Sequence, residues 1–174
     1  MNSKSFTIIL CLFLILRLHA QAVNHFEISF ENAVHHEAVI TAVFHDLDDK
    51  ILSVRMSRTS PGRYAIHEFA KNVYGLRAED SQGKKLKVNR HDPYQWDIEG
   101  HDGTVKITYT LFANRADGTY SQIDETHAHL NMPASFIYAP DYADRPIQIK
   151  FHPREDLKWK IATQLKHLEG NLYY

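Results

Sequence analysis

The chain has 174 residues, 44% of them hydrophobic, and its formal net charge at pH 7 is −1. A near-neutral chain without basic runs lacks the clustered Lys and Arg that neutralise phosphates, so we expect no nucleic acid as a partner. The length suits one globular domain with a sizeable hydrophobic core.

The first 22 residues have the features of a secretory signal peptide. A positive start precedes an almost wholly apolar run from Phe6 to Leu16, and small residues follow that permit cleavage after Ala20 or Ala22. The alternative is an amino-terminal membrane anchor, but a span needs about 20 apolar residues and Arg17 interrupts the run. We therefore predict that residues 1–22 are a signal peptide. The protein is then exported, to the periplasm, cell surface or medium, with no membrane attachment after cleavage.

Cysteine usage agrees with export. The only cysteine, Cys11, lies in the predicted signal peptide, so residues 23–174 can form neither a disulfide nor a thiolate metal site. Removing residues 1–22 also shifts the net charge from −1 to −3, because Lys4 and Arg17 are lost.

Residues 23–174 alternate between apolar and polar side chains in short segments separated by turn residues. We predict strands at residues 25–30, 36–44, 51–56, 72–79, 86–88, 94–98, 105–112, 146–151 and 159–163, with short apolar segments at 127–132 and 135–138. Strands at about ten-residue spacing are typical of an antiparallel all-β sandwich or saddle. We expect a single β-sandwich domain over residues 23–174, with very little helix.

A Pro-Gly pair organises the first half of this domain. Pro61 presets φ and Gly62 accepts a positive φ, the combination that a type II turn requires. After the turn, Tyr64, Ile66 and Phe69 are predicted to contribute large apolar groups to the core. A short helical turn over residues 64–71 is compatible with the pattern.

This stretch resembles a known signature. Residues 59–64 (T-S-P-G-R-Y) and 67–73 (H-E-F-A-K-N-V) are similar to W-T-P-G-S-Y-x-x-R-E/D-F-A-K-x-V, found in the amino-terminal β-domain of the glycyl aminopeptidases. These are metallopeptidase family sixty-one, gluzincins that often carry a PDZ domain. The sequence departs from the signature at Arg58, Arg63 and His67, where the family has Trp, Ser and often Arg. The matching positions to which we assign a structural role are Pro61, Gly62, Tyr64, Glu68 and Phe69.

The resemblance covers nearly all of residues 23–174 and implies a function. The parent protein would bind zinc and release amino-terminal Gly or Ala from peptides. Its β-domain would pack on a thermolysin-like catalytic domain, which is absent from this sequence, and wall one side of the cleft for the peptide substrate. We expect Asn131, Met132 and Pro133, within the segment 130–138, to face that cleft. The alternative is an ordinary bulged strand broken by Pro133.

The sequence contains no gluzincin zinc motif. In H-E-x-x-H, two histidines four apart on a helix bind zinc and the Glu activates water. Of the two His-Glu pairs, His36-Glu37 is followed by Ile40 and His67-Glu68 by Lys71 at the place of the second histidine. We therefore expect this chain alone not to hydrolyse peptides and to bind no cofactor, the zinc belonging to the catalytic domain.

His127 and His129 are the only metal candidates with a defined spacing. Two imidazoles on one side of a strand could bind zinc or copper if a third ligand converged. His35, His36, His45 or Asp124 could supply that ligand, but no spacing selects one of them. The simpler interpretation is that both histidines are polar strand positions facing water.

A second interpretation of the whole chain is a stand-alone secreted β-sandwich module that binds glycans or peptides. Tyrosines near polar loops could stack on sugar rings, whereas Trp96 and Trp159 are assigned to the core. The carboxy end discriminates between the two interpretations, since a domain excised from a larger protein should expose an apolar patch. Apolar residues crowd that end and favour excision, namely Leu165, Leu168, Leu172, Tyr173 and Tyr174.

Overall fold

The computed structural model describes residues 22–48 and 50–174 of the chain. The predicted signal peptide, apart from Ala22, lies outside the described residues. Strands dominate, which confirms the predicted all-β class: within the described ranges the α-helix is a single short segment, α2 (Met132–Ser135). The described part of the chain contains no helix long and apolar enough to cross a membrane.

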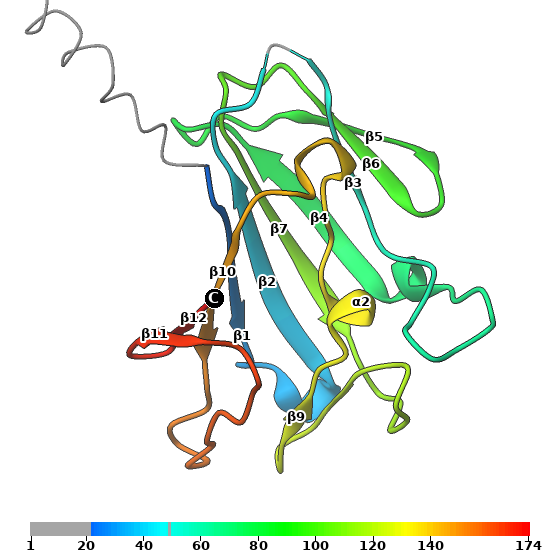
Figure 1. Ribbon diagram of the computed structural model, residues 1–174, viewed down its shortest axis with the longest axis vertical. Coiled ribbons are helices and arrows are strands. Elements are labelled where there is room, and N and C mark those ends of the chain that lie inside the picture. The colour runs from blue at the N-terminus through cyan, green and yellow to red at the C-terminus, as the bar shows by residue number, and fades with distance from the viewer. Residues whose placement is uncertain (1–21, 49) are drawn as a thin grey trace, which may run out of the picture.

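A seven-stranded sheet forms the body of the domain (Figure 1). Its strands lie in the order β11 (His167–Glu169), β12 (Leu172–Tyr173), β10 (Ile147–His152), β1 (Asn24–Ser29), β2 (Glu37–Phe44), β7 (Val105–Phe112) and β4 (Val73–Glu79). Neighbours are antiparallel except β1 and β10, which run parallel from the pair Asn24 and Ile147 to the pair Ser29 and His152. The sheet is mixed because β10 reaches β1 through a long connection instead of a hairpin.

Smaller elements cover one face of this sheet. A three-stranded sheet has the order β3 (Leu52–Arg55), β6 (Gln95–Glu99) and β5 (Lys87–Asp92), and β8 (Gln122–Ile123) pairs with β9 (Ala128–His129). The short 3₁₀ helices are η1 (Ala33–His35), η2 (Phe69–Asn72) and η3 (Pro140–Tyr142). In Figure 1 the three-stranded sheet lies over the upper part of the large sheet and α2 lies lower on the same side.

The core lies between these layers, and the alternation in the sequence explains which face is buried. On β7, Val105, Ile107, Tyr109 and Leu111 are all buried, as predicted, while Lys106 faces out. On β2 the predicted apolar face is buried in the same way and consists of Ala38, Ile40, Ala42 and Phe44. Because every second residue of these strands is buried, these side chains lie on the covered face of the sheet, and the other face is left open.

The segment after the Pro-Gly turn corrects one prediction. Phe69 is buried as expected, but Tyr64 is 105% exposed and Ile66 is 67% exposed, so neither belongs to the core. The backbone of the turn protrudes from the domain and returns only where the His67 N–H donates to the Arg58 carbonyl at 2.8 Å. The helical turn is shorter than the pattern allowed and is η2, which begins at Phe69.

Two strand predictions also differ from the structure: the sequence predicts that residues 72–79 and 86–88 form a hairpin through a turn at Gly83, and that residues 159–163 form a strand. The turn around Gly83 forms, with φ of 78° and its N–H donating to the Asp80 carbonyl at 3.1 Å. The flanking strands separate, however: β4 pairs with β7, β5 pairs with β6, and one bridge joins Glu79 to Lys85. Residues 159–163, predicted as a strand, have no regular structure. Alternation alone cannot identify the partner strand, which long-range packing selects.

The two tryptophans have different environments. Trp96 is buried in the core as predicted. Trp159 is only half-buried; it packs on Phe30 with the ring centroids 5.3 Å apart, and its indole N–H donates to the Glu125 carbonyl at 3.2 Å. At the carboxy end, Leu172 and Tyr173 are half-buried in β12, while Leu168 and Tyr174 remain exposed.

Candidate functional site

Asn131, one of the predicted cleft residues, joins three segments that are far apart in sequence. Its side-chain amide donates to the Ser60 hydroxyl at 3.1 Å and to the Thr119 carbonyl. Its backbone N–H donates to the Ser121 hydroxyl at 3.0 Å. Ser60, Thr119 and Ser121 are all buried. The Asn131 amide group is therefore occupied in holding the protein together, and its N–H groups are not free for a ligand.

A second layer of hydrogen bonds fixes the short helix that follows. The Ser135 hydroxyl bonds to the Asn131 carbonyl at 2.9 Å and to the Ser121 hydroxyl at 2.8 Å. The Tyr109 hydroxyl donates to the Ser135 carbonyl at 2.8 Å and accepts the Ile137 N–H at 3.3 Å. Burial raises the pKa of the Tyr109 phenol well above its ordinary value, so this donor stays protonated. The helix α2 is thus anchored to the middle of β7.

The predicted signature turn is held at its base by a charged cluster. Arg63 donates its backbone N–H to the Ser60 carbonyl at 3.1 Å, which closes the turn, and Gly62 has φ of 77°. The Arg58 guanidinium lies 3.7 Å from the centroid of the Tyr94 ring and 3.6 Å from the Glu68 carboxylate. The structure therefore brings the signature turn and the segment at Asn131 together, through the bond between Ser60 and Asn131.

Met132 and Pro133 start α2. Pro133 occupies the first turn of the helix, where its missing N–H costs no hydrogen bond. The Met132 side chain is 39% exposed and lies at the edge of a groove. The alternative of a bulged strand broken by Pro133 is wrong, because the chain forms a helical turn here.

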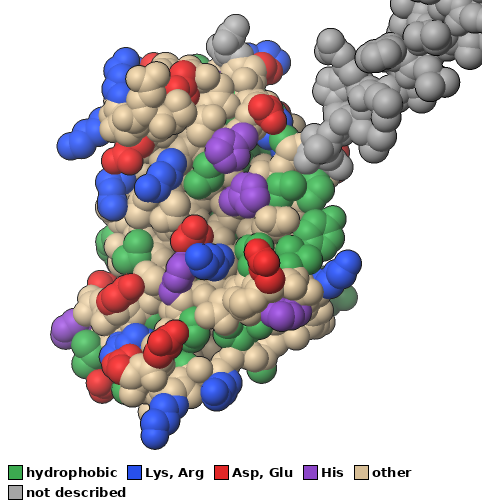
Figure 2. All heavy atoms as spheres, turned by 90° about the vertical axis from the view of Figure 1, so that its left-hand side faces the viewer, with side chains coloured by type: hydrophobic (Ala, Val, Ile, Leu, Met, Phe, Trp, Pro, Cys, Tyr) green, Lys and Arg blue, Asp and Glu red, His purple; other side chains and the backbone are tan. Residues whose placement is uncertain are grey.

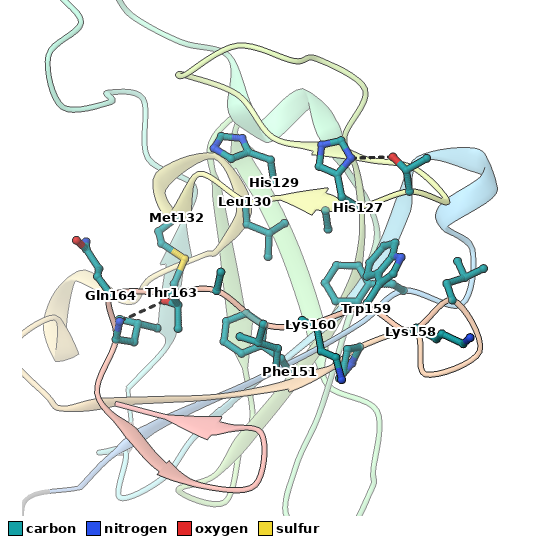
Figure 3. Close-up of a pocket in the computed structure, with 18 residues that line it drawn as sticks. His127, His129, Leu130, Met132, Phe151, Lys158, Trp159, Lys160, Thr163 and Gln164 are labelled. Carbon is teal, nitrogen blue, oxygen red and sulfur yellow. Dashed lines mark hydrogen bonds between the residues drawn. The ribbon is translucent and has the colours of Figure 1, made fainter.

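This groove has a volume of about 590 Å³ (Figure 3). It lies between the segment 126–132, which includes β9, and the carboxy-terminal segment 157–165. Figure 3 shows Leu130 and Phe151 projecting into it and Trp159 at one end. A volume of this size is typical of small-molecule sites.

His127 and His129 both line this groove. Nδ1 of His127 is 2.8 Å from the Thr126 hydroxyl and 3.6 Å from the Asp124 carboxylate. Hydrogen bonds from the Thr126 side chain and backbone lower the pKa of Asp124 to about 2, so its carboxylate is charged and engaged in the turn between β8 and β9. Within residues 22–48 and 50–174, no three His, Cys, Asp or Glu side chains are placed to hold a metal ion.

Neither His-Glu pair lies on an α-helix. His36 follows η1 with φ of 63°, and its Nδ1 is 2.6 Å from the Ile123 carbonyl oxygen. His67 stacks on the Phe69 ring with the centroids 5.0 Å apart. A gluzincin site needs both histidines on one helical face, so neither place offers the geometry of a catalytic zinc centre.

The open side of the sheet carries a smaller, polar hollow. It has a volume of about 230 Å³ and is lined in part by Glu27, Glu31, Thr41 and His152. Nε2 of His152 lies 2.8 Å from the Glu27 carboxylate, and a hydrogen bond from the Ser29 hydroxyl lowers the pKa of Glu31. Figure 2, which faces the left-hand side of Figure 1, shows histidines dispersed among acidic and basic side chains. The Glu27 and Glu31 carboxylates that line this hollow are already paired within the domain.

The sequence alone did not identify the buried hydroxyl groups that hold the site, namely those of Ser60, Ser121, Ser135 and Tyr109. A signal existed for two of them, because Ser60 precedes the Pro-Gly turn and Ser135 follows Pro133 by two positions. Short hydroxylated residues at such places often bond to nearby backbone. The partners, however, come from distant segments that only the fold brings together.

Comparison with solved structures shows a shared fold. A crystal structure of an aminopeptidase N family protein from Idiomarina loihiensis matches with a TM-score of 0.81 and 20% sequence identity, over 86% of this chain and 26% of that one. A cytochrome b561, DM13 and DOMON domain-containing protein of Arabidopsis thaliana is 32% identical over 87 residues, which is 45% of this chain and 10% of that protein. The chain thus spans about a quarter of the first protein and a tenth of the second.

The sequence also matches a family description across almost all of the described residues. The match is to the Peptidase M61 N-terminal domain, over residues 25–174, and it includes the signature turn, α2 and the groove. It confirms the resemblance found in the sequence. The chain therefore belongs to the Peptidase M61 N-terminal domain family.

Proposed function

We propose that this chain is the non-catalytic β-domain of an exported zinc aminopeptidase and that it packs on the catalytic domain of that enzyme. The supporting observation is a family match over residues 25–174 in a sequence without H-E-x-x-H. The family description names an amino-terminal domain of a peptidase, so the zinc chemistry would belong to another domain. That domain would hold the zinc ion, and this chain would supply a wall for the peptide substrate.

The segment 130–138, which includes α2, is the part that we assign to the cleft. Asn131 acts as a positioning residue, because both its amide N–H groups are engaged with Ser60 and Thr119. Met132 is the exposed group that it presents. A side chain held on a rigid support contacts a substrate without a large ordering cost. The parent enzyme would release small residues such as Gly or Ala from the amino terminus of peptides.

The test of the catalytic assignment begins with the DNA that follows the Tyr174 codon. An open frame that encodes H-E-x-x-H and, further on, a Glu would support the proposal. A stop codon with no such frame nearby would contradict it and favour a stand-alone secreted module that binds glycans or peptides. The purified chain should also leave glycine and alanine 4-nitroanilides uncleaved with and without added zinc, and hydrolysis would overturn the non-catalytic assignment.

Export has its own test, since it depends on the predicted signal peptide. The chain should be expressed with its own amino terminus and the mature product analysed by intact mass and amino-terminal sequencing. Cleavage should leave Gln21 or Val23 as the first residue. A product that retains Met1 and stays with the membrane fraction would favour the membrane anchor.

A further inference from the structure

Cleavage of the predicted signal peptide after Ala22 would place a histidine third in the mature chain. Of the two candidate positions, this one has small residues both one and three places before the cut, Ala22 and Ala20, whereas cleavage after Ala20 has Leu18 at the third place. The mature chain then begins Val23-Asn24-His25. A free amino terminus followed by a histidine at the third position offers several nitrogen ligands within one short stretch.

These nitrogen atoms form a chelate of defined geometry. They are the α-amine of Val23, the backbone nitrogens of Asn24 and His25, and Nδ1 of the His25 imidazole. Because one chain joins them, they close adjacent chelate rings and lie in a plane around a single ion. Square-planar nitrogen coordination is typical of Cu(II) and Ni(II), and Cu(II) is the ion of the divalent first-row series that such ligands bind most tightly. Zn²⁺ has no preference for this geometry and is usually tetrahedral in proteins.

The structure places His25 where an ion can reach it. β1 starts at the periphery of the domain (Figure 1), and Val23 and His25 are half-buried on either side of the buried Asn24. His25 lies on the open face of the sheet, and its ring centroid is 6.0 Å from that of the exposed His45. Among the described residues, no group forms a hydrogen bond with the His25 ring, so its nitrogens are available to a ligand.

Metal binding requires the end of the strand to open. The Asn24 N–H donates to the Pro146 carbonyl at 2.9 Å, and His25 is the β1 residue paired with Val43 of β2. The metal replaces both amide protons, which pass to solvent, so these residues must leave the ladder. Chain ends open locally without unfolding the domain. The closed state is also incompletely satisfied, because the buried Oδ1 of Asn24 has no hydrogen-bond partner among the described residues.

We propose that the mature amino terminus, Val23-Asn24-His25, is a square-planar site for Cu(II) or Ni(II). The α-amine, the two deprotonated amide nitrogens and Nδ1 of His25 bind the ion. Most of these ligands belong to the main chain, so the site differs from the clusters of His, Cys, Asp and Glu side chains considered above. It rests on the export part of the proposed function, because the α-amine of Val23 exists only after cleavage, but it does not depend on a catalytic domain.

The experiment uses the exported product, purified without a histidine tag, whose first residue is read by amino-terminal sequencing. Val23 is the residue expected. Cu(II) is added together with excess glycine, which removes loosely bound ions. We expect the chain to retain one Cu(II) ion with the visible absorption band of a planar nitrogen complex, and Ni(II) to give a yellow, diamagnetic complex. Zn²⁺ added in the same way should not be retained, because it does not favour a square plane.

Variants identify the ligands. Insertion of a glycine between Ala22 and Val23 keeps every side chain but makes His25 the fourth residue of the mature chain, and His25→Ala removes the imidazole. Both changes should abolish the retained Cu(II) and its absorption band. His45→Ala is the matched control, because it removes the neighbouring histidine and should keep both. Far-UV circular dichroism checks that each variant folds.

Four results would overturn the proposal. They are a first residue other than Val23, no retained Cu(II) on a chain that begins with Val23, retention by the variant with the inserted glycine, and loss in His45→Ala, which would indicate a site of two imidazoles. The first residue separates this failure from that of the proposed function. A product that keeps Met1 contradicts export as well, whereas a chain that begins with Val23 or Gln21 and retains no copper leaves the proposed function intact.

Discussion

At the scale of single residues, the candidate site depends on polar groups that are buried and paired. Asn131 connects the loop at Ser60 to the loop at Thr119, and Tyr109 connects β7 to α2. A buried polar group that loses its partner costs more than the hydrogen bond itself contributed. Substitutions at these positions therefore test the geometry of the site through stability.

The first prediction concerns Asn131→Ala. The change leaves the Ser60 hydroxyl and the Thr119 carbonyl without their partner in a buried place, so we expect a loss of about 1–3 kcal/mol in the free energy of unfolding. Urea denaturation followed by fluorescence measures it. Asn114→Ala, an exposed asparagine on a neighbouring loop, should change stability by less than about 0.5 kcal/mol. Equal effects of the two substitutions would show that the Asn131 amide is not a structural link.

The second prediction concerns pH and Tyr109. Burial raises the pKa of this phenol above its ordinary value of 10.0. Above about pH 10 the unfolded chain loses the phenolic proton and the folded chain keeps it, so the unfolded state binds fewer protons and stability falls as pH rises. One such group contributes a slope of up to about 1.4 kcal/mol per pH unit.

Urea titrations between about pH 9 and pH 11 should therefore show a shallower fall in stability for Tyr109→Phe than for the unchanged protein. Tyr74→Phe is the control, because Tyr74 is exposed whereas Tyr109 is fully buried. If the three proteins lost stability with the same slope, the phenol of Tyr109 would not be held protonated by burial.

At the scale of elements, the signature stretch combines a protruding turn with a buried anchor. Phe69 at the start of η2 is fully buried and packs edge-on against Tyr120 at 4.9 Å between ring centroids, while Tyr64 in the turn is exposed. The two aromatic residues of one signature therefore have different roles. Phe69 holds the element in place, and Tyr64 contributes a surface group that is free to contact another molecule.

The third prediction separates these roles. Phe69→Ala should lower the free energy of unfolding by about 3–5 kcal/mol, because it leaves a cavity in the core. Tyr64→Ala should change it by less than about 0.5 kcal/mol, because the ring makes no buried contact. Thermal and urea denaturation of both variants check this. A large loss for Tyr64→Ala would mean that the turn folds onto the domain in solution.

At the scale of the whole molecule, one mixed sheet covered on a single side supports every part of the site. The parallel pair of β1 and β10 brings the carboxy-terminal third of the chain against its beginning. That pairing places residues 157–165 opposite β9 and so creates the groove. The described residues hold this arrangement together without a disulfide or a three-ligand metal site.

The fourth prediction follows from the lack of a three-ligand metal site among the described residues. Addition of zinc should leave the melting temperature of the purified chain unchanged, and so should EDTA, because a ligand stabilises a fold only if it binds the folded state. Differential scanning fluorimetry measures both. A rise with zinc that His129→Ala abolishes would establish a metal site at His127 and His129 and contradict the prediction. His91→Ala, which alters an exposed histidine on β5, is the matched control.

Much of the fold could be predicted from the sequence because local patterns record it directly. The two-residue alternation on β2 and β7 identifies the buried face, and the Pro61-Gly62 pair identifies a turn. The signature around that turn indicated the family, which the match over residues 25–174 confirms. The absence of H-E-x-x-H is likewise visible in the sequence alone.

Other features were decided only by the tertiary structure. Alternation gave Tyr64 and Ile66 the same apolar signal as Phe69, yet only Phe69 reaches the core, because the turn leads the chain away from the sheet before η2 returns to it. The parallel pairing of β1 with β10, the pairing of β4 with β7 in place of β5, and the bond between Asn131 and Ser60 all join residues remote in sequence. The local sequence determines which side chains are apolar and favour burial. The strands and loops against which they pack are selected by packing of the whole chain around one core.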